Sequence, residues 1–261
     1  MPSFKIAGGS VYFEFWQADA KAPWVTLLGG HARTSADFRM FAKKVCERNF
    51  NVVTLDYRGF GQSHFMGKHT MSDLVLDVHC LWGEIGVSRS HVLGISMGGL
   101  LAQSLLVTHF DRVDSLTLIS TTPTLEYYLK KNDPWLDNYA AILQKLKYYF
   151  APSFAVANNN LIEAMAKTVH TTIQKTDFLQ AAQYQRDAIS TFKPLMPSSD
   201  FAKLKALIIH GLDDQVIAAQ AAQKFLSLFS NGEVELLANV GHLVLAESNK
   251  WLLERFISFL I

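Results

Sequence analysis

The amino-acid sequence predicts an α/β fold, with a mostly parallel central sheet covered by helices on both faces. Short, nearly continuous apolar runs recur along the chain, as expected for strands that are buried on both faces. Helical patterns with apolar residues at i, i+3, i+4 and i+7 separate the runs, so strand and helix alternate. The runs are WVTLL (24–28), NVVTLD (51–56), HVLGI (91–95), SLTLIS (115–120), ALIIHG (206–211) and VELLA (234–238).

Length and composition fit one α/β domain that carries an insertion. The chain has 261 residues, of which 49% are hydrophobic and 18% charged, so it holds enough apolar side chains for a large core. The formal net charge is +1, and lysine and arginine are scattered along the chain. We therefore predict no nucleic-acid partner, because nucleic-acid binding requires a concentrated basic surface.

Cysteine usage and the N-terminal stretch bear on the compartment. Cys46 and Cys80 fall in separate predicted helices and form no CxxC motif. Sparse cysteine is typical of a reducing compartment. MPSFKIAGGSVYFEFWQ lacks a basic region followed by an apolar one, and no apolar run reaches the length of a membrane span. These observations predict a cytoplasmic protein with no membrane span, whose oligomeric state the sequence leaves open.

The other core elements follow in chain order. FKIAGGSVYFEF (4–15) alternates around Gly8 and Gly9, which predicts an antiparallel hairpin at one edge of the sheet. Apolar stripes predict a helix after each of the first two apolar runs and a third helix that closes the chain. The stripes are Phe38, Phe41, Ala42 and Val45; Leu74, Val78, Leu81, Trp82 and Ile85; and Trp251, Leu253, Phe256, Ile257 and Leu260.

One long segment interrupts the alternation of strand and helix. Between Thr121 and Ser199 the sequence shows helical patterns separated by NDPW, FAPS and FKPLMPSSD, and no convincing strand. We predict that residues 122–198 form a helical lid, and that residues 1–121 and 199–261 form the two parts of the core domain. The lid carries large side chains that pack against the core or line a pocket. Examples are Trp135, Tyr139, Met165 and Tyr184.

A serine flanked by glycines lies between a predicted strand and a predicted helix. The sequence there is Gly94-Ile95-Ser96-Met97-Gly98. A serine hydroxyl that attacks a carbonyl must stand clear of its own backbone, on a sharp turn that only small neighbours permit. Ser96 is therefore the predicted nucleophile; the alternative is a serine in an ordinary tight turn.

A nucleophilic serine needs a base, and the base needs an orienting carboxylate. In this kind of fold the acid and then the histidine follow the nucleophile along the chain, each in a loop at the carboxyl end of a later strand. Of the nine histidines, His242 in NVGHLVL alone lies beyond the last acid-bearing strand. Asp214 in HGLDD is the predicted acid, with Asp213 as an alternative and Glu126 as a more distant third.

The tetrahedral intermediate of acyl transfer carries an oxyanion, which two backbone N–H groups must stabilise. One predicted donor is Met97, at the start of the helix. The second is His31, in LLGGHARTSADF, where Gly29 and Gly30 let the chain turn back towards Ser96. A glycine-rich loop at this place could also serve the turn alone.

Together these motifs resemble the α/β-hydrolase superfamily, and the resemblance covers most of the chain outside the lid. GISMGG is similar to its nucleophile elbow, HGLDD to its acid loop, VGHL to its histidine loop, and LDYRGFGQS (55–63) to the turn after the strand before the elbow. Within the superfamily the chain resembles the lidded group of carboxylesterases, enol-lactonases, cofactor-free haloperoxidases and carbon–carbon bond hydrolases.

Two positions depart from the family pattern. The family usually has His-Gly where this chain has Gly29-Gly30, which concerns the shape of the oxyanion loop. The acid loop of the family usually continues to a proline, whereas here Val216 is followed by Ile217. Arg58 in DYRGFGQS is expected to be structural.

The predicted function is that of a serine hydrolase that cleaves an ester-like bond of a small or medium, largely hydrophobic molecule. No metal and no organic cofactor is expected, since the chain has no HExxH motif, no Cys/His ligand spacing and no phosphate loop. The same residues also suit an enol-lactone, a thioester or a carbon–carbon bond, because the fold and its motifs do not fix the substrate. An alternative of another class is a binding protein that holds a small ligand without converting it.

Overall fold

The computed structural model describes residues 2–65, 67–128 and 134–261. Within these residues one sheet contains nine strands in the order β1-β2-β4-β3-β6-β7-β8-β9, with β5 paired to β2. The strands are β1 Ser3–Ile6, β2 Gly9–Trp16, β3 Trp24–Leu28, β4 Asn51–Leu55, β5 His64–Phe65, β6 Ser90–Ile95, β7 Val113–Ile119, β8 Ala206–Gly211 and β9 Gly232–Leu237.

The predicted pattern of strands is confirmed. β4, β3, β6, β7, β8 and β9 pair in parallel, and β1 and β2 form the antiparallel hairpin at one edge. Every residue of β4 and of β8 is buried, because helices cover both faces of the sheet. A parallel sheet brings the carboxyl ends of its strands to one edge, where the loops after β3, β6, β8 and β9 meet.

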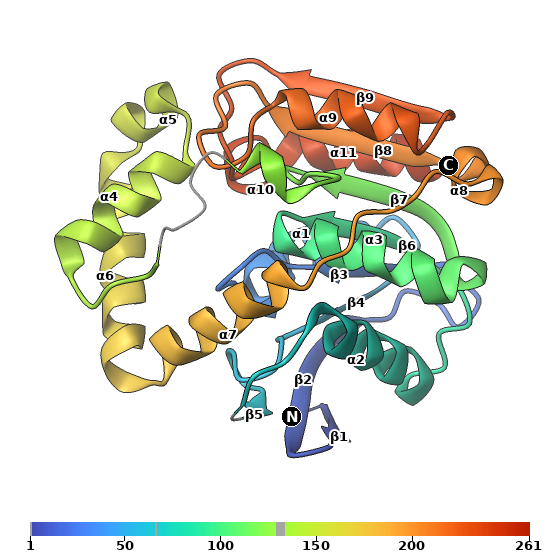
Figure 1. The fold of residues 1–261 in the computed structure, drawn as a ribbon, viewed down its shortest axis with the longest axis horizontal. Coiled ribbons are helices and arrows are strands. Elements are labelled where there is room, and N and C mark those ends of the chain that lie inside the picture. The colour runs from blue at the N-terminus through green and yellow to red at the C-terminus, as the bar shows by residue number, and fades with distance from the viewer. Residues whose placement is uncertain (1, 66, 129–133) are drawn as a thin grey trace.

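Helices cover the sheet in two layers, each with its own apolar cluster. In Figure 1, α2, α3 and α9 lie on the near side of the sheet and α1 and α11 on the far side. The helices are α1 Arg39–Cys46, α2 Met71–Glu84, α3 Met97–His109, α4 Tyr139–Tyr149, α5 Pro152–Ala157, α6 Asn159–Lys175, α7 Phe178–Ser190, α8 Ser199–Lys203, α9 Gln220–Lys224, α10 Val244–Glu247 and α11 Asn249–Leu260.

The closing helix buries a face slightly different from the predicted one. Leu253, Phe256 and Ile257 are buried as expected, but Trp251 is 38% exposed. Leu252 and Phe259 are buried instead. The predicted apolar stripe is therefore one residue off at each end. Helix α11 packs against α1 with Leu252 and Phe259 turned inwards.

The region of the predicted lid is helical. Helices α4, α5 and α6 lie together at the left of Figure 1, beside the sheet, and α7 runs from them towards the centre of the view. Their inner faces form a third apolar cluster, which includes Trp135, Ile142, Leu146 and Ile162 and also Phe60 from the core. The described part of 122–198 contains no strand. Tyr128 forms an isolated β-bridge with Ile217, in the loop after β8. Residues 129–133 of this region lie outside the described residues.

Candidate active site

Ser96 occupies the sharp turn between β6 and α3. Its backbone has φ +54° and ψ −115°, a conformation that costs a non-glycine residue about 1–3 kcal/mol. The flanking glycines allow the close approach: a Cβ at Gly98 would lie 2.1 Å from the carbonyl oxygen of Leu28, and one at Gly94 would lie 2.3 Å from the carbonyl oxygen of Gly98. The turn is fixed from the side by Thr121, whose Oγ1 donates to the carbonyl of Ser96 at 2.8 Å. The glycines of the motif are therefore a steric requirement of the turn.

His242 lies in the loop after β9 and faces Ser96. Its Nε2 is 3.0 Å from Ser96 Oγ, and its Nδ1 is 2.8 Å from Asp214 Oδ2. The backbone N–H of His242 donates to the carbonyl of Tyr149 at 2.9 Å, and the ring of Tyr149 meets the imidazole edge-on. The imidazole is 95% buried, so these contacts hold it in one orientation.

Asp214 follows β8, and its carboxylate is surrounded by hydrogen-bond donors. Oδ1 accepts from the backbone N–H groups of Val216 at 2.8 Å and Ile217 at 2.9 Å. Oδ2 accepts from His242. Of the three predicted acids, Asp214 thus makes the contact with His242, whereas Asp213 is partly exposed beside it and Glu126 is exposed.

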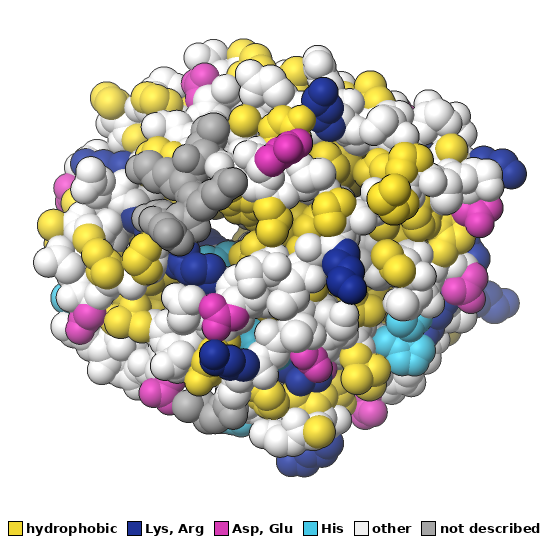
Figure 2. Space-filling model, viewed as in Figure 1, with side chains coloured by type: hydrophobic (Ala, Val, Ile, Leu, Met, Phe, Trp, Pro, Cys, Tyr) yellow, Lys and Arg dark blue, Asp and Glu magenta, His cyan; other side chains and the backbone are white. Residues whose placement is uncertain are grey.

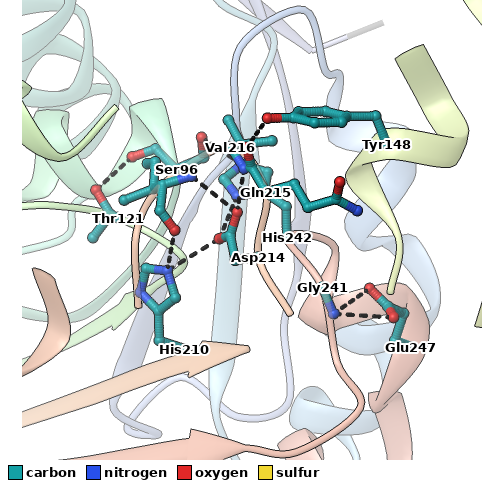
Figure 3. A network of polar contacts seen from close by, with 11 residues as sticks. Ser96, Thr121, Tyr148, His210, Asp214, Gln215, Val216, Gly241, His242 and Glu247 are labelled. Carbon is teal, nitrogen blue, oxygen red and sulfur yellow. Dashed lines mark hydrogen bonds and ion pairs between the residues drawn. The ribbon is translucent and has the colours of Figure 1, made fainter. Parts of the chain in front are cut away.

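A second histidine at this carboxylate was not singled out from the sequence. His210, the fifth residue of β8, is fully buried, and its Nε2 lies 3.0 Å from Asp214 Oδ2 and 3.1 Å from the carbonyl oxygen of Ile217. The signal was present in ALIIHGLDD, since His210 is a polar residue within a buried apolar run directly before the acid loop. Figure 3 shows the ring below the carboxylate, with one dashed line to Asp214 and another to a backbone carbonyl oxygen.

The two histidines determine the electrostatic state of Asp214. Burial by itself would raise the pKa of this carboxyl, but attraction to His242 and hydrogen bonds from His210 and His242 outweigh burial and hold the pKa well below the usual range. Asp214 is therefore a carboxylate, which only accepts hydrogen bonds. Burial, and then the charge of Asp214, raises the pKa of Tyr128, which lines the same site.

The predicted oxyanion residues lie on either side of Ser96. Met97 begins α3 directly after the serine, and its side chain is buried in the core. His31 lies in the loop after β3, and its Nε2 is 2.8 Å from the carbonyl oxygen of Ala182 in α7. Gly30 brings this loop onto the serine, since a Cβ there would lie 3.5 Å from Ser96 Cβ.

A cavity of about 880 Å³ opens above Ser96 between the sheet and helices α4, α6 and α7. Its walls combine apolar and aromatic side chains with a set of polar ones. The apolar and aromatic residues include Phe38, Leu125, Tyr128, Tyr149, Met165, Ile189, Val216 and Leu245. The polar residues include Arg33, Asp37, Gln183, Arg186, Asp187 and Ser190. On the face drawn in Figure 2, acidic and basic side chains are interspersed.

A partly buried carboxylate joins the helical region to the histidine loop. Glu247 of α10 accepts from the N–H of Ala151 at 3.0 Å and from the N–H of Gly241 at 3.1 Å. At Gly241 a Cβ would lie 2.4 Å from the nitrogen of Ala151, so the two segments touch backbone to backbone. The hydroxyl of Tyr148 donates to the carbonyl of Gln215 in the acid loop. Figure 3 shows the contact of Glu247 with Gly241 and the contact of Tyr148 with Gln215.

Arg58 has the structural role expected of it. Its Nε lies 2.6 Å from Oδ2 of Asp77 on α2, and both side chains are at least 91% buried. This ion pair attaches the turn that follows β4 to helix α2.

Among residues 2–65, 67–128 and 134–261, no group of three or more His, Cys, Asp or Glu side chains is arranged to hold a metal ion. In the same residues no helix is both long and apolar enough to cross a bilayer.

Comparison with known proteins places this geometry in a family. A family model described as Serine aminopeptidase, S33, matches residues 19–249. Over 248 residues the chain is 20% identical to RutD of Yersinia enterocolitica, provisionally named a carbamate hydrolase, with 89% of this chain and 85% of the relative covered. It is 21% identical to the 2-hydroxy-6-oxo-6-(2'-aminophenyl)hexa-2,4-dienoic acid hydrolase of Metapseudomonas resinovorans, with 98% and 89% covered.

Solved structures agree on the fold. A meta-cleavage product hydrolase of Pseudomonas fluorescens superimposes with a TM-score of 0.84 at 17% identity, over 100% of this chain and 97% of the other. The enol-lactonase of Burkholderia xenovorans does so with a TM-score of 0.80 at 19% identity, over 99% of both chains. The chain therefore belongs to the serine aminopeptidase S33 family, a family of hydrolases with the α/β-hydrolase fold.

Proposed function

We propose that the chain is a serine hydrolase that cleaves an ester-like bond through an acyl-enzyme, with Ser96, His242 and Asp214 as its catalytic triad. The observation that carries the proposal is the unbroken hydrogen-bond chain from Ser96 Oγ through the His242 imidazole to the Asp214 carboxylate. A nucleophile, its base and the group that orients the base stand in this relation in acyl-transfer enzymes.

The contacts assign a role to each atom. Because the Asp214 carboxylate only accepts, the proton of neutral His242 resides on Nδ1, and the lone pair of Nε2 faces Ser96 Oγ. Nε2 takes the proton of Ser96 as Oγ attacks the carbonyl carbon, and then gives it to the leaving group. Water, deprotonated by the same nitrogen, releases the acyl group and restores the serine. Asp214 stabilises the imidazolium in both steps.

The oxyanion of each tetrahedral intermediate would be bound by the backbone N–H groups of Met97 and His31. Support comes from the place of Met97 at the first turn of α3, where amides are unpaired and the helix dipole is positive. His31 lies in the loop that Gly30 brings against Ser96. Loss of one such donor typically costs about 10²- to 10³-fold in rate.

We propose further that residues 122–198 act as the lid that selects the substrate. The helices of this region have their own apolar cluster and supply Met165, Gln183 and Ile189 to the cavity wall. A cavity of about 880 Å³ with mainly apolar walls suits a medium-sized hydrophobic acyl or leaving group.

Two measurements test the proposal. A fluorophosphonate probe should label the folded protein at Ser96 and leave the Ser96→Ala variant unlabelled. p-Nitrophenyl esters of graded acyl length should be hydrolysed by the wild type, with kcat/KM rising to a medium chain length, and not by Ser96→Ala. A folded wild-type protein that is neither labelled nor active would contradict the proposal and favour a ligand-binding protein on the same fold.

Cleavage of an enol-lactone or a carbon–carbon bond is the second candidate. It is favoured by relatives named for these reactions: the hexadienoic acid hydrolase of Metapseudomonas resinovorans and, at 36% identity over 72 residues, the 3-oxoadipate enol-lactonase 1 of Acinetobacter baylyi. Those 72 residues are 28% of this chain. Enol-lactone and meta-cleavage substrates assayed beside the esters would distinguish the two candidates by their kcat/KM ratio.

A further inference from the structure

His210 is a buried histidine with a contact on one side of its ring. The side chain has no exposed surface, and Nε2 lies between Asp214 Oδ2 at 3.0 Å and the carbonyl oxygen of Ile217 at 3.1 Å. Within the described residues Nδ1, which is also buried, has no hydrogen-bond partner. A buried polar side chain with this pattern requires an explanation.

The neighbours of His210 determine its tautomer. A carboxylate and a peptide carbonyl only accept hydrogen bonds, so Nε2 must carry a proton. A second proton on Nδ1 would place a charged ring nitrogen in the interior without an acceptor, which is costly. The ring is therefore a neutral Nε2–H donor directed at Asp214.

Asp214 Oδ2 consequently receives two imidazole N–H groups. His242 approaches it at 2.8 Å through Nδ1 and His210 at 3.0 Å through Nε2, while Oδ1 is occupied by two backbone amides. Each donor draws electron density from the oxygen that His242 uses. A neutral donor on the same oxygen therefore weakens the attraction of the carboxylate for the protonated form of His242.

We propose that His210 is a positioning residue of the active site that acts through Asp214: it fixes the carboxylate and limits how strongly Oδ2 holds the proton of His242. The proposal rests on the proposed serine hydrolase function. It explains why a histidine rather than an apolar residue is the fifth of the six residues of the buried strand β8. Other titratable groups that face Asp214 are Tyr128 and Glu247, and the variants below leave both in place.

The test compares His210→Gln with His210→Met. The two side chains have the same length, but glutamine can present an N–H group where Nε2 lies and methionine cannot. We expect His210→Met to lower kcat by about 10-fold or more and to leave KM nearly unchanged, as for the loss of a hydrogen bond to a charged group. We also expect the acidic limb of its kcat/KM profile to move to higher pH, by up to about one unit. His210→Gln should restore most of the rate and the wild-type profile.

The proposal is overturned if His210→Met keeps the wild-type rate and pH profile, or if His210→Gln loses as much as His210→Met while both remain folded by thermal unfolding. If His210→Met does not fold, a ¹⁵N NMR spectrum of the wild-type protein tests the proposal instead. In ¹⁵N-histidine-labelled protein at pH 7, His210 should show a protonated Nε2 and an unprotonated Nδ1. The opposite tautomer contradicts the proposal. This spectrum remains informative even if fluorophosphonate fails to label Ser96, so the two proposals fail separately.

Discussion

At the scale of single residues, Ser96 shows how the turn imposes a cost on the proposed nucleophile. Its positive φ of 54° suits glycine far better than any residue with a Cβ, yet a hydroxyl is present there. The strand before it and the helix after it are both buried, so the surrounding packing maintains the strained conformation.

We expect Ser96→Gly to be more stable than Ser96→Ala by about 1 kcal/mol, because glycine adopts this backbone conformation without strain. Both variants should lack hydrolase activity. Urea unfolding of the two variants measures the difference, and activity assays with the graded esters check the loss. Equal stability of the two variants would mean that the turn relaxes when the hydroxyl is removed.

The adjacent aspartates give a matched pair of variants. Asp214→Asn should lower kcat on the order of 10⁴-fold, because an amide in place of the carboxylate no longer stabilises the imidazolium or its required tautomer. Asp213→Asn should change kcat little, since Asp213 is partly exposed and Asp214 makes the contact with His242. Steady-state kinetics on both variants tests the assignment, which fails if Asp213→Asn is the more damaging change.

Asp214 should also link stability to pH. Its pKa in the folded chain lies well below that of an unfolded aspartate, about 3.9, so the carboxylate contributes stability above that pH. As pH falls below about 5 the unfolded chain takes up a proton that the folded chain does not, and the contribution is lost. Between about pH 5 and about pH 3, the urea midpoint of the wild type should therefore fall more steeply than that of Asp214→Asn.

At the scale of elements, the loops that carry the proposed triad depend on the helical region beside them. The N–H of His242 bonds to the carbonyl of Tyr149, and Glu247 bridges the backbone of Gly241 and Ala151. The junction of α4 and α5 therefore holds the histidine loop from one side. Any displacement of this junction would move His242 relative to Ser96.

We expect Glu247→Ala to cost about 1–3 kcal/mol, because it leaves two partly buried N–H groups without their acceptor. It should also lower kcat, since the loop that carries His242 loosens. Glu247→Gln is the control: one oxygen of the wild-type carboxylate, Oε2, accepts from both N–H groups, so a carboxamide oxygen can replace it. Thermal unfolding and kcat are the measurements, and a Gln variant as damaged as the Ala variant would indicate that the charge itself matters.

At the scale of the whole molecule, the apolar side chains form separate clusters. Two clusters cover the faces of the sheet, and a third fills the space between α4, α6 and α7. The end of α7 leaves that third cluster, since Ala188 packs with the sheet core, as do Phe192 and Leu195 after it. The third cluster also contains Ala32 and Phe60 from loops of the core, so the helical region packs against the core as well as internally.

If residues 122–198 act as a lid, this region should open without unfolding the sheet. Native-state hydrogen exchange should then show amides of α4 to α6 exchanging with a smaller opening free energy than amides of β6, β7 and β8. The Leu146→Ala variant, in the cluster of the helical region, should increase exchange in α4 to α6 and leave the central strands protected. Uniform protection across the chain would contradict a separately mobile lid.

The sequence by itself determined the alternating strands and helices, the edge hairpin, the helical insertion, and the strand-to-helix turn at Ser96. These follow from local information, because burial on both faces gives continuous apolar runs and a tight turn demands glycine. The burial of Leu252 in place of Trp251 was not determined, because the face that α11 turns inwards depends on its packing against α1.

Only the tertiary structure decided which acid meets His242 and which further groups hold that acid. Asp213 and Asp214 are neighbours of identical chemistry, and the difference between them is the direction in which the loop after β8 points each side chain. His210 is only four positions from Asp214, but Glu247 contacts Ala151 across 96 positions of the sequence, and the carbonyl of Tyr149 contacts the N–H of His242 across 93. Such contacts depend on how separate loops converge at one edge of the sheet, which no local pattern encodes.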